Sequence, residues 1–146
     1  MRLLVVEDDP LIGSAMRAVL EQARHTVLGP VRYAAKALRI AERDRPDLAL
    51  VDLALPGGEN GLSLARRLDA MKVPCLLVTG YDYTPEEAGS ATIGVLRKPF
   101  APDVLLASIG AVGEALAGMT TTPPPNQLRL FAARLAHFVP MGHAPH

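Results

Sequence analysis

Polar side chains that can bind and transfer a phosphoryl group follow four short apolar runs of the chain. The acids Glu7-Asp8-Asp9 come after the first run, Asp52 after the third, Thr79 after the fourth and Lys98 after the fifth. A carboxylate is a competent nucleophile toward phosphorus, and an ammonium with a hydroxyl suits phosphoryl oxygens. Several carboxylates at one site raise one another's pKa unless a cation lies between them, and Mg²⁺ prefers oxygen ligands. The set therefore predicts magnesium-dependent phosphoryl transfer if the fold brings these residues together.

The chain carries these residues on a repeated alternation of strands and helices. Five continuous apolar runs are typical of strands buried on both faces: residues 3–6, 26–31, 48–51, 75–78 and 93–96. Each run is followed by a stretch with apolar residues at helical spacing. This alternation predicts an α/β fold, a doubly wound five-stranded parallel sheet with helices on both faces. In such a sheet the chemistry lies at the carboxyl ends of the strands.

The predicted helices differ in strength. Asp9 followed by Pro10 is typical of an N-cap and a first helical position, so the first helix begins there. The fifth helix has a clean apolar stripe made by Leu105, Ile109, Val112 and Leu116. The fourth is weak, because Pro85 and Gly89 limit it to residues 84–90. We expect a short fourth helix in a segment that is mobile.

A change of composition near residue 118 divides the chain. We expect one domain over residues 1–118, a linker rich in threonine and proline over 119–126 and an amphipathic tail over 127–146. In the tail, one helical face carries Leu128, Phe131, Leu135 and Phe138. Such a helix can pack back on the domain, or present its apolar face to a partner or a second copy.

Composition excludes several classes of protein. The 146 residues are 49% hydrophobic and 21% charged, with a net charge of +0, so no basic excess points to nucleic acid or to acidic membranes. Cys75 is the one cysteine and lies in an apolar run, where a buried core residue is expected. No apolar stretch reaches the roughly 18 residues of a membrane span, and Glu7 interrupts the apolar N-terminus too early for a signal peptide. We expect a cytoplasmic protein.

Four segments resemble motifs of the bacterial response-regulator receiver family, the CheY-like domains, over residues 1 to 117. They are Leu3-Leu-Val-Val-Glu-Asp-Asp-Pro10, Leu48-Ala-Leu-Val-Asp-Leu-Ala-Leu-Pro56 with the glycines that follow it, Leu77-Val-Thr-Gly80 and Arg97-Lys-Pro-Phe100. Each is weak alone, since a single strand-end acid, lysine or threonine has ordinary structural explanations. The occurrence of all four segments in this order, each at the end of the corresponding strand, is a specific signature of the receiver family. The resemblance implies a flavodoxin-like strand order of 2-1-3-4-5.

The resemblance also implies a role for each site residue. Asp52 is the implied acceptor of a phosphoryl group from a histidine kinase or a histidine phosphotransfer protein. Asp8 is implied to bind Mg²⁺ directly and Glu7 through water, with Asp52 and the Ala54 carbonyl completing the protein ligands. Lys98 is implied to pair with the phosphate beside a cis Lys98–Pro99 bond, and Thr79 to turn inward to hydrogen-bond a phosphoryl oxygen. Asp9 keeps its structural role as an N-cap.

The sequence departs from the common pattern in its switch residues. Many receivers carry an aromatic residue three positions before the lysine, and here that position is Val95. Pro74-Cys-Leu-Leu-Val-Thr-Gly-Tyr81 partly resembles the FATGUY subgroup of single-domain regulators, although Leu77 and Val78 replace its usual phenylalanine and alanine. We therefore take Thr79, Tyr81 and Tyr83 as candidate switch residues.

These features favour a single-domain response regulator that signals by phosphorylation-dependent binding of a downstream protein and is not an enzyme in the usual sense. A homodimer through the fifth helix or the tail is an additional expectation. An alternative is a phosphate sink or shuttle without an effector of its own. A phosphatase on a similar sheet is less favoured, because Asp52-Leu-Ala54 lacks the second acid of the haloacid-dehalogenase Asp-x-Asp pattern. No phosphate-binding Gly-x-x-x-x-Gly-Lys loop and no helix-turn-helix is evident.

Overall fold

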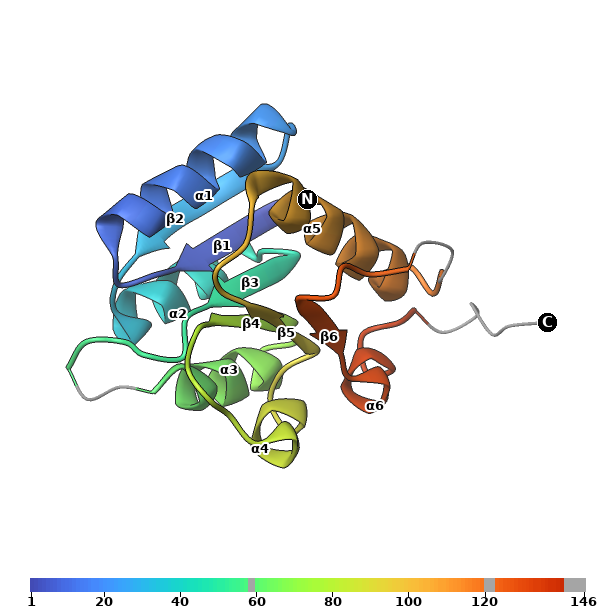
Figure 1. Cartoon of the computed structure of the whole chain (residues 1–146). Helices are drawn as coiled ribbons and strands as arrows, with labels where there is room; N and C mark the ends of the chain where they lie inside the picture. The colour runs from blue at the N-terminus through green and yellow to red at the C-terminus, as the bar shows by residue number, and fades with distance from the viewer. Residues whose placement is uncertain (58–59, 120–122, 141–146) are drawn as a thin grey trace.

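A twisted sheet with helices on both sides forms the body of the molecule (Figure 1). The computed structural model describes residues 1–57, 60–119 and 123–140, and within these ranges the strand order is β2-β1-β3-β4-β5-β6. The parallel strands are β1 (Arg2–Val6), β2 (Thr26–Val31), β3 (Leu48–Val51), β4 (Cys75–Thr79) and β5 (Gly94–Arg97). The predicted fold class and the order of these five strands are confirmed.

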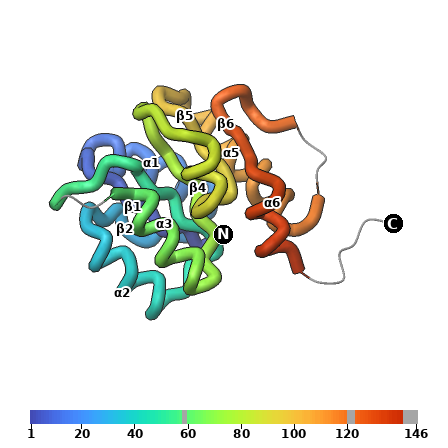
Figure 2. Tube along the Cα trace, turned by 90° about the horizontal axis from the view of Figure 1, so that it is seen from below, coloured from blue at the N-terminus to red at the C-terminus, as the bar shows by residue number. Residues whose placement is uncertain are grey.

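The helices divide between two cores. α1 (Pro10–Gln22) and α5 (Pro102–Leu116) cover one face, and α2 (Ala34–Asp44), α3 (Gly61–Ala70) and α4 (Pro85–Gly89) cover the other (Figure 1, Figure 2). Alternate residues of β1 enter different cores: Leu3 and Val5 join the core under α1 and α5, and Leu4 joins the core under α2 and α3. Because both of its faces are buried, the central strand β3 is a continuous apolar run.

Local capping explains where the helices begin. Asp9 Oδ1 accepts hydrogen bonds from the backbone N–H of Leu11 at 2.9 Å and of Ile12 at 3.4 Å, which confirms it as the N-cap of α1. The predicted short fourth helix is present as the five residues of α4, capped by the Thr84 hydroxyl. Among the described residues, no helix has the length and apolar character to span a bilayer.

The tail differs from its prediction as one amphipathic helix. Residues Leu128–Leu130 form β6, antiparallel to β5, and only Ala132–Leu135 form a helix, α6. The strand forms because β5 would otherwise be an edge strand, and its backbone N–H and C=O groups gain hydrogen-bond partners when β6 is added. Gly94 permits this pairing, since a Cβ there would lie 2.5 Å from the Arg129 carbonyl oxygen. Residues 120–122 of the expected linker and 141–146 of the expected tail lie outside the described residues.

Candidate functional site

Two buried carboxylates and a lysine meet at the carboxyl edge of the sheet. β1 and β3 are neighbours in the register Val6 with Val51, so Glu7 and Asp52 follow side by side, and the Asp52 N–H donates to the Val6 carbonyl at 3.0 Å. Glu7 is 3% and Asp52 8% exposed. Lys98 Nζ donates to Glu7 Oε1 and lies 3.5 Å from Asp52 Oδ2. The sequence-predicted Glu7, Asp52 and Lys98 are therefore together.

The position of Lys98 is set by its backbone. Its N–H donates to the Thr79 carbonyl at 2.9 Å, at the point where β4 and β5 end together. The Lys98–Pro99 peptide bond is cis, as the resemblance implies. The lysine side chain, which is 18% exposed, extends from the end of β5 to the acids beyond β1 and β3.

The environment of Glu7 favours a neutralising cation. Burial, together with the adjacent Asp52 carboxylate, raises the pKa of the Glu7 carboxyl from 4.5 to about 7, although Lys98 acts in the opposite direction. Glu7 Oε2 is buried and has no hydrogen-bond partner among the described residues. An unpartnered carboxylate oxygen beside a second acid is a donor set that suits Mg²⁺.

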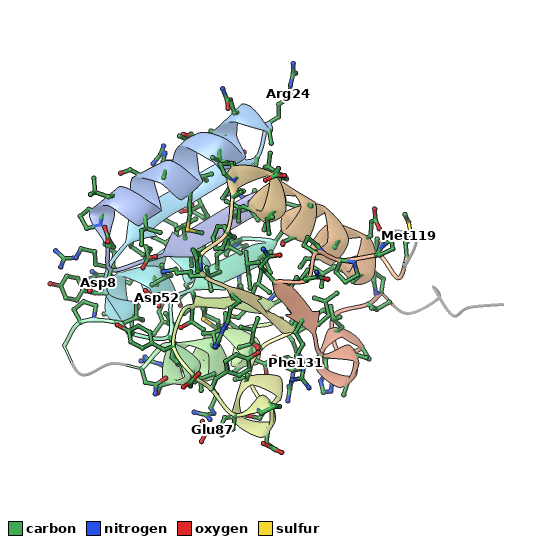
Figure 3. The ribbon with its side chains drawn as sticks, in the orientation of Figure 1. Asp8, Arg24, Asp52, Glu87, Met119 and Phe131 are labelled. Carbon is green, nitrogen blue, oxygen red and sulfur yellow. The ribbon has the colours of Figure 1, made fainter. Side chains whose placement is uncertain are left out.

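Asp8 occupies a different position from the one expected of a metal ligand. Its Oδ1 accepts from Arg32 Nη2 at 3.2 Å and Nε at 3.4 Å, and the described residues hold no cluster of three acidic, histidine or cysteine side chains suited to a metal ion. Figure 3 labels Asp8 and Asp52 at the same edge of the sheet. Glu7 and Asp52 present carboxylate oxygens of the kind that suit a cation, whereas Asp8 is paired with Arg32. Arg32 directly follows β2, and residues that follow parallel strands lie at the carboxyl edge of the sheet. No sequence motif pointed to this arginine.

Hydrogen bonds between side chains and the backbone hold the two ends of the loop after Asp52. The Ala54 N–H donates to Asp52 Oδ1 at 3.3 Å, and the Asn60 side chain caps α3 by accepting from Leu62 N at 2.7 Å. A Cβ on Gly61 would overlap the Asp52 carbonyl oxygen, so only glycine permits this approach of α3 to the acceptor strand.

The candidate switch residues form a second group next to Lys98. The Thr79 side chain is fully buried, and its Oγ1 accepts from the Tyr81 N–H at 3.0 Å. Tyr81 is 63% exposed, whereas Tyr83 is partly buried against the core under α2 and α3. Arg97 links the two tyrosines, since it donates to the Tyr81 carbonyl at 3.1 Å and stacks over the Tyr83 ring at 6.0 Å.

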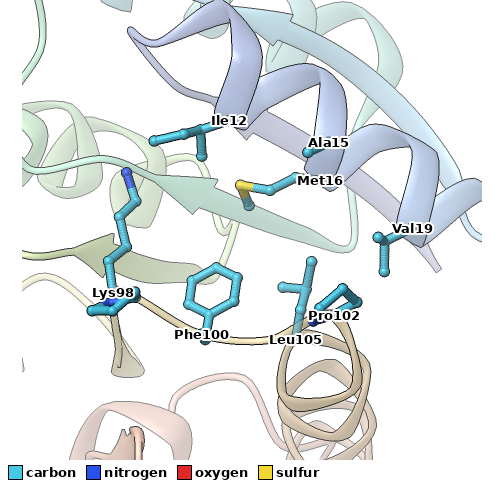
Figure 4. Close-up of a pocket in the computed structure, with 9 residues that line it drawn as sticks. Ile12, Ala15, Met16, Val19, Lys98, Phe100, Pro102 and Leu105 are labelled. Carbon is cyan, nitrogen blue, oxygen red and sulfur yellow. The ribbon is translucent and has the colours of Figure 1, made fainter.

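An apolar pocket of about 290 Å³ borders the site (Figure 4). Its walls come from α1, the β5–α5 connection and the first turn of α5, which contribute Met16, Phe100 and Leu105 respectively. Figure 4 shows Lys98 at one end and Val19 at the other. Lys98 therefore lines the pocket and also contacts the acids.

Comparison with known proteins identifies the family. The model of the response regulator receiver domain matches residues 3–110. This chain belongs to that family. Its solved structural neighbours are CheY-like domains, among them CheY4 of Vibrio cholerae, at 25% identity and a TM-score of 0.68 over 75% of this chain and 95% of that one. The expected receiver domain of two-component systems is thus confirmed.

Named relatives extend this result. The phyllosphere-induced regulator PhyR of Methylorubrum extorquens is 35% identical over 68% of this chain and 39% of its own length. The virulence transcriptional regulatory protein PhoP of Salmonella typhimurium is 33% identical over 93% of this receiver chain and 63% of its own length. The signal receiver domain of a modulated diguanylate cyclase from Desulfovibrio desulfuricans is 35% identical, with a TM-score of 0.68 over 75% of this chain and 90% of that domain. The chain spans less than two thirds of the curated relatives it matches.

Proposed function

We propose that Asp52 accepts a phosphoryl group from a histidine kinase or a histidine phosphotransfer protein, and that the phosphorylated chain signals by binding a downstream protein. The observation that carries this proposal is the placement of the Asp52 carboxylate, which is 8% exposed and 3.5 Å from Lys98 Nζ at the carboxyl edge of the sheet. Membership of the receiver family supports it.

In the proposed reaction an Asp52 oxygen attacks phosphorus, a phosphorus–oxygen bond forms, and the bond to the donor imidazole breaks. The Ala54 N–H holds Asp52 Oδ1, which orients the carboxylate. Lys98 is positioned by its backbone bond to Thr79 to neutralise charge on the phosphoryl oxygens. Asp8, Asp52 and the Ala54 carbonyl, with Glu7 through water, would hold Mg²⁺, which would add further stabilisation of that charge.

Thr79 and Tyr81 are the proposed route from the site to the surface. The Thr79 hydroxyl oxygen accepts from the Tyr81 N–H, so turning the hydroxyl toward a phosphoryl group releases the backbone of Tyr81. Val95 is buried and carries no ring, which leaves Tyr81 or Tyr83 to act as the aromatic gate. We expect Tyr81→Ala to leave phosphorylation intact and to abolish the phosphate-induced change in partner affinity. Unchanged coupling in that variant would exclude Tyr81.

The test of the acceptor uses mass spectrometry of the intact chain. After incubation with Mg²⁺ and acetyl phosphate, we expect the wild type to gain the mass of one phosphoryl group and Asp52→Ala to gain none. Asp103→Ala, at an exposed acid in the first turn of α5, is the matched control and retains the label. Labelling that survives Asp52→Ala would overturn the proposal, and EDTA tests the need for a divalent cation.

A further inference from the structure

Residues 127–138 close an edge of the sheet that would otherwise be free. β6 pairs with β5 in the register Val95 with Arg129, and the pairing is extended at both ends. The Arg97 N–H donates to the Gln127 carbonyl at 2.9 Å, and the Phe131 N–H donates to the Ile93 carbonyl at 2.8 Å. Figure 1 shows this segment lying along β5, away from the N-terminal half of the sheet.

The side chains of the segment cover both faces next to that edge. Leu128 and Leu135 are buried in the core under α5, whereas Phe131 packs on the opposite face near Gly89 of α4. Arg134 reaches α3, where Nη1 donates to Asp69 Oδ2 at 3.0 Å. The segment therefore contacts α3, α4, β5 and α5, although it consists of a three-residue strand and a four-residue helix.

One residue joins the segment to the phosphoryl site. Arg97 holds β6 through its backbone N–H, and it holds the loop after Thr79 through its guanidinium, which donates to the Tyr81 carbonyl at 3.1 Å and pairs with Asp82 at 3.4 Å. Its chain neighbour is Lys98, which lies against Asp52. Arg97 therefore contacts both the loop that carries Tyr81 and Gln127, the residue before β6.

We propose that residues 127–138 are an intramolecular cap on the β5 edge, and that phosphorylation of Asp52 releases the cap. This inference rests on the proposed function. A phosphoryl group draws Lys98 away from Glu7 and takes the hydroxyl of Thr79, so the Tyr81 backbone loses its acceptor. The Arg97 guanidinium then loses its hydrogen bond to the Tyr81 carbonyl. As Arg97 shifts, the hydrogen bond from its backbone N–H to the Gln127 carbonyl weakens. Release uncovers the β5 edge together with the apolar surface beneath Leu128 and Leu135.

Hydrogen exchange of the full chain tests the cap. The chain is incubated with Mg²⁺ and acetyl phosphate, the acyl phosphate is quantified by intact mass, and exchange over residues 127–138 is then measured. We expect exchange in this segment to rise at least about tenfold in the phosphorylated chain. In Asp52→Ala it stays at the resting rate.

Two arginine variants test whether specific contacts hold the cap in place. Arg134→Ala removes the tie to Asp69, so exchange of the segment rises without phosphorylation while labelling of Asp52 continues. Arg129→Ala is the matched control. Arg129 is exposed, and its ring contact is with Phe131 of the same segment, so the substitution removes an arginine without removing a tie between the segment and α3. It leaves exchange close to that of the wild type.

The outcomes distinguish the cap from the function on which it rests. If the acyl phosphate forms and exchange over residues 127–138 is unchanged or slower, the proposed release of the cap is wrong and the acceptor role of Asp52 stands. Rapid exchange of this segment in the unphosphorylated chain also overturns the cap. If no acyl phosphate forms on Asp52, the proposed function fails and the cap with it.

Discussion

Replacing Glu7 by glutamine should change the way in which stability depends on pH. Burial is the chief cause that raises the pKa of the Glu7 carboxyl from 4.5 to about 7 in the folded chain. Between these values the folded state holds a proton that the unfolded state has lost. The free energy of unfolding of the wild type must therefore fall as the pH rises through this window, and the loss is complete above pH 7.

The magnitude follows from the size of the shift. One pKa unit corresponds to about 1.36 kcal/mol, so a rise from 4.5 to about 7 costs the folded state about 3 kcal/mol at pH 8. A glutamine side chain is neutral at every pH and nearly equal in shape to the protonated acid. We expect Glu7→Gln to match the wild type near pH 4 and to exceed it by about 3 kcal/mol at pH 8.

Urea unfolding followed by circular dichroism, from pH 4 to pH 8 in EDTA, measures this difference. Glu42→Gln, at an exposed position of α2, is the matched control and should stay within about 0.5 kcal/mol of the wild type. Mg²⁺ at pH 8 should then stabilise the wild type more than Glu7→Gln, because the ion binds the folded carboxylate. A difference between wild type and Glu7→Gln that does not change with pH would refute the reasoning.

Three further substitutions or reactions test the packing around the site. Gly61→Ala should lower the free energy of unfolding by about 3 kcal/mol or more in urea, because its Cβ overlaps the Asp52 carbonyl oxygen; an unchanged midpoint would contradict this. Leu128→Ala should cost about 2–3 kcal/mol in the same assay, since β6 is part of the core, and a surface-like loss below about 0.5 kcal/mol would show that it is not. Complete burial raises the pKa of the Cys75 thiol, so iodoacetamide at pH 8 should label it only in urea, and labelling of the folded chain would count against this packing.

The sequence predicted the parallel sheet because burial on both faces leaves a continuous apolar run, and this signal is local. Residues 48–51 and 75–78 are examples, and each is followed at once by its polar residue, Asp52 or Thr79. Once strands are parallel and neighbouring, their carboxyl ends must meet. The meeting of Glu7, Asp52 and Lys98 follows from those two facts.

The tertiary structure decided what depends on contacts between distant residues. Leu128 and Leu135 fit a helical stripe as well as they fit a strand followed by a turn, and only the free edge of β5 selects the strand. The pairing of Asp8 with Arg32 likewise requires the loops after β1 and β2 to approach, which no local pattern encodes. Side-chain charge and spacing along the chain therefore determined which groups reach the carboxyl edge, whereas packing determined which of them touch.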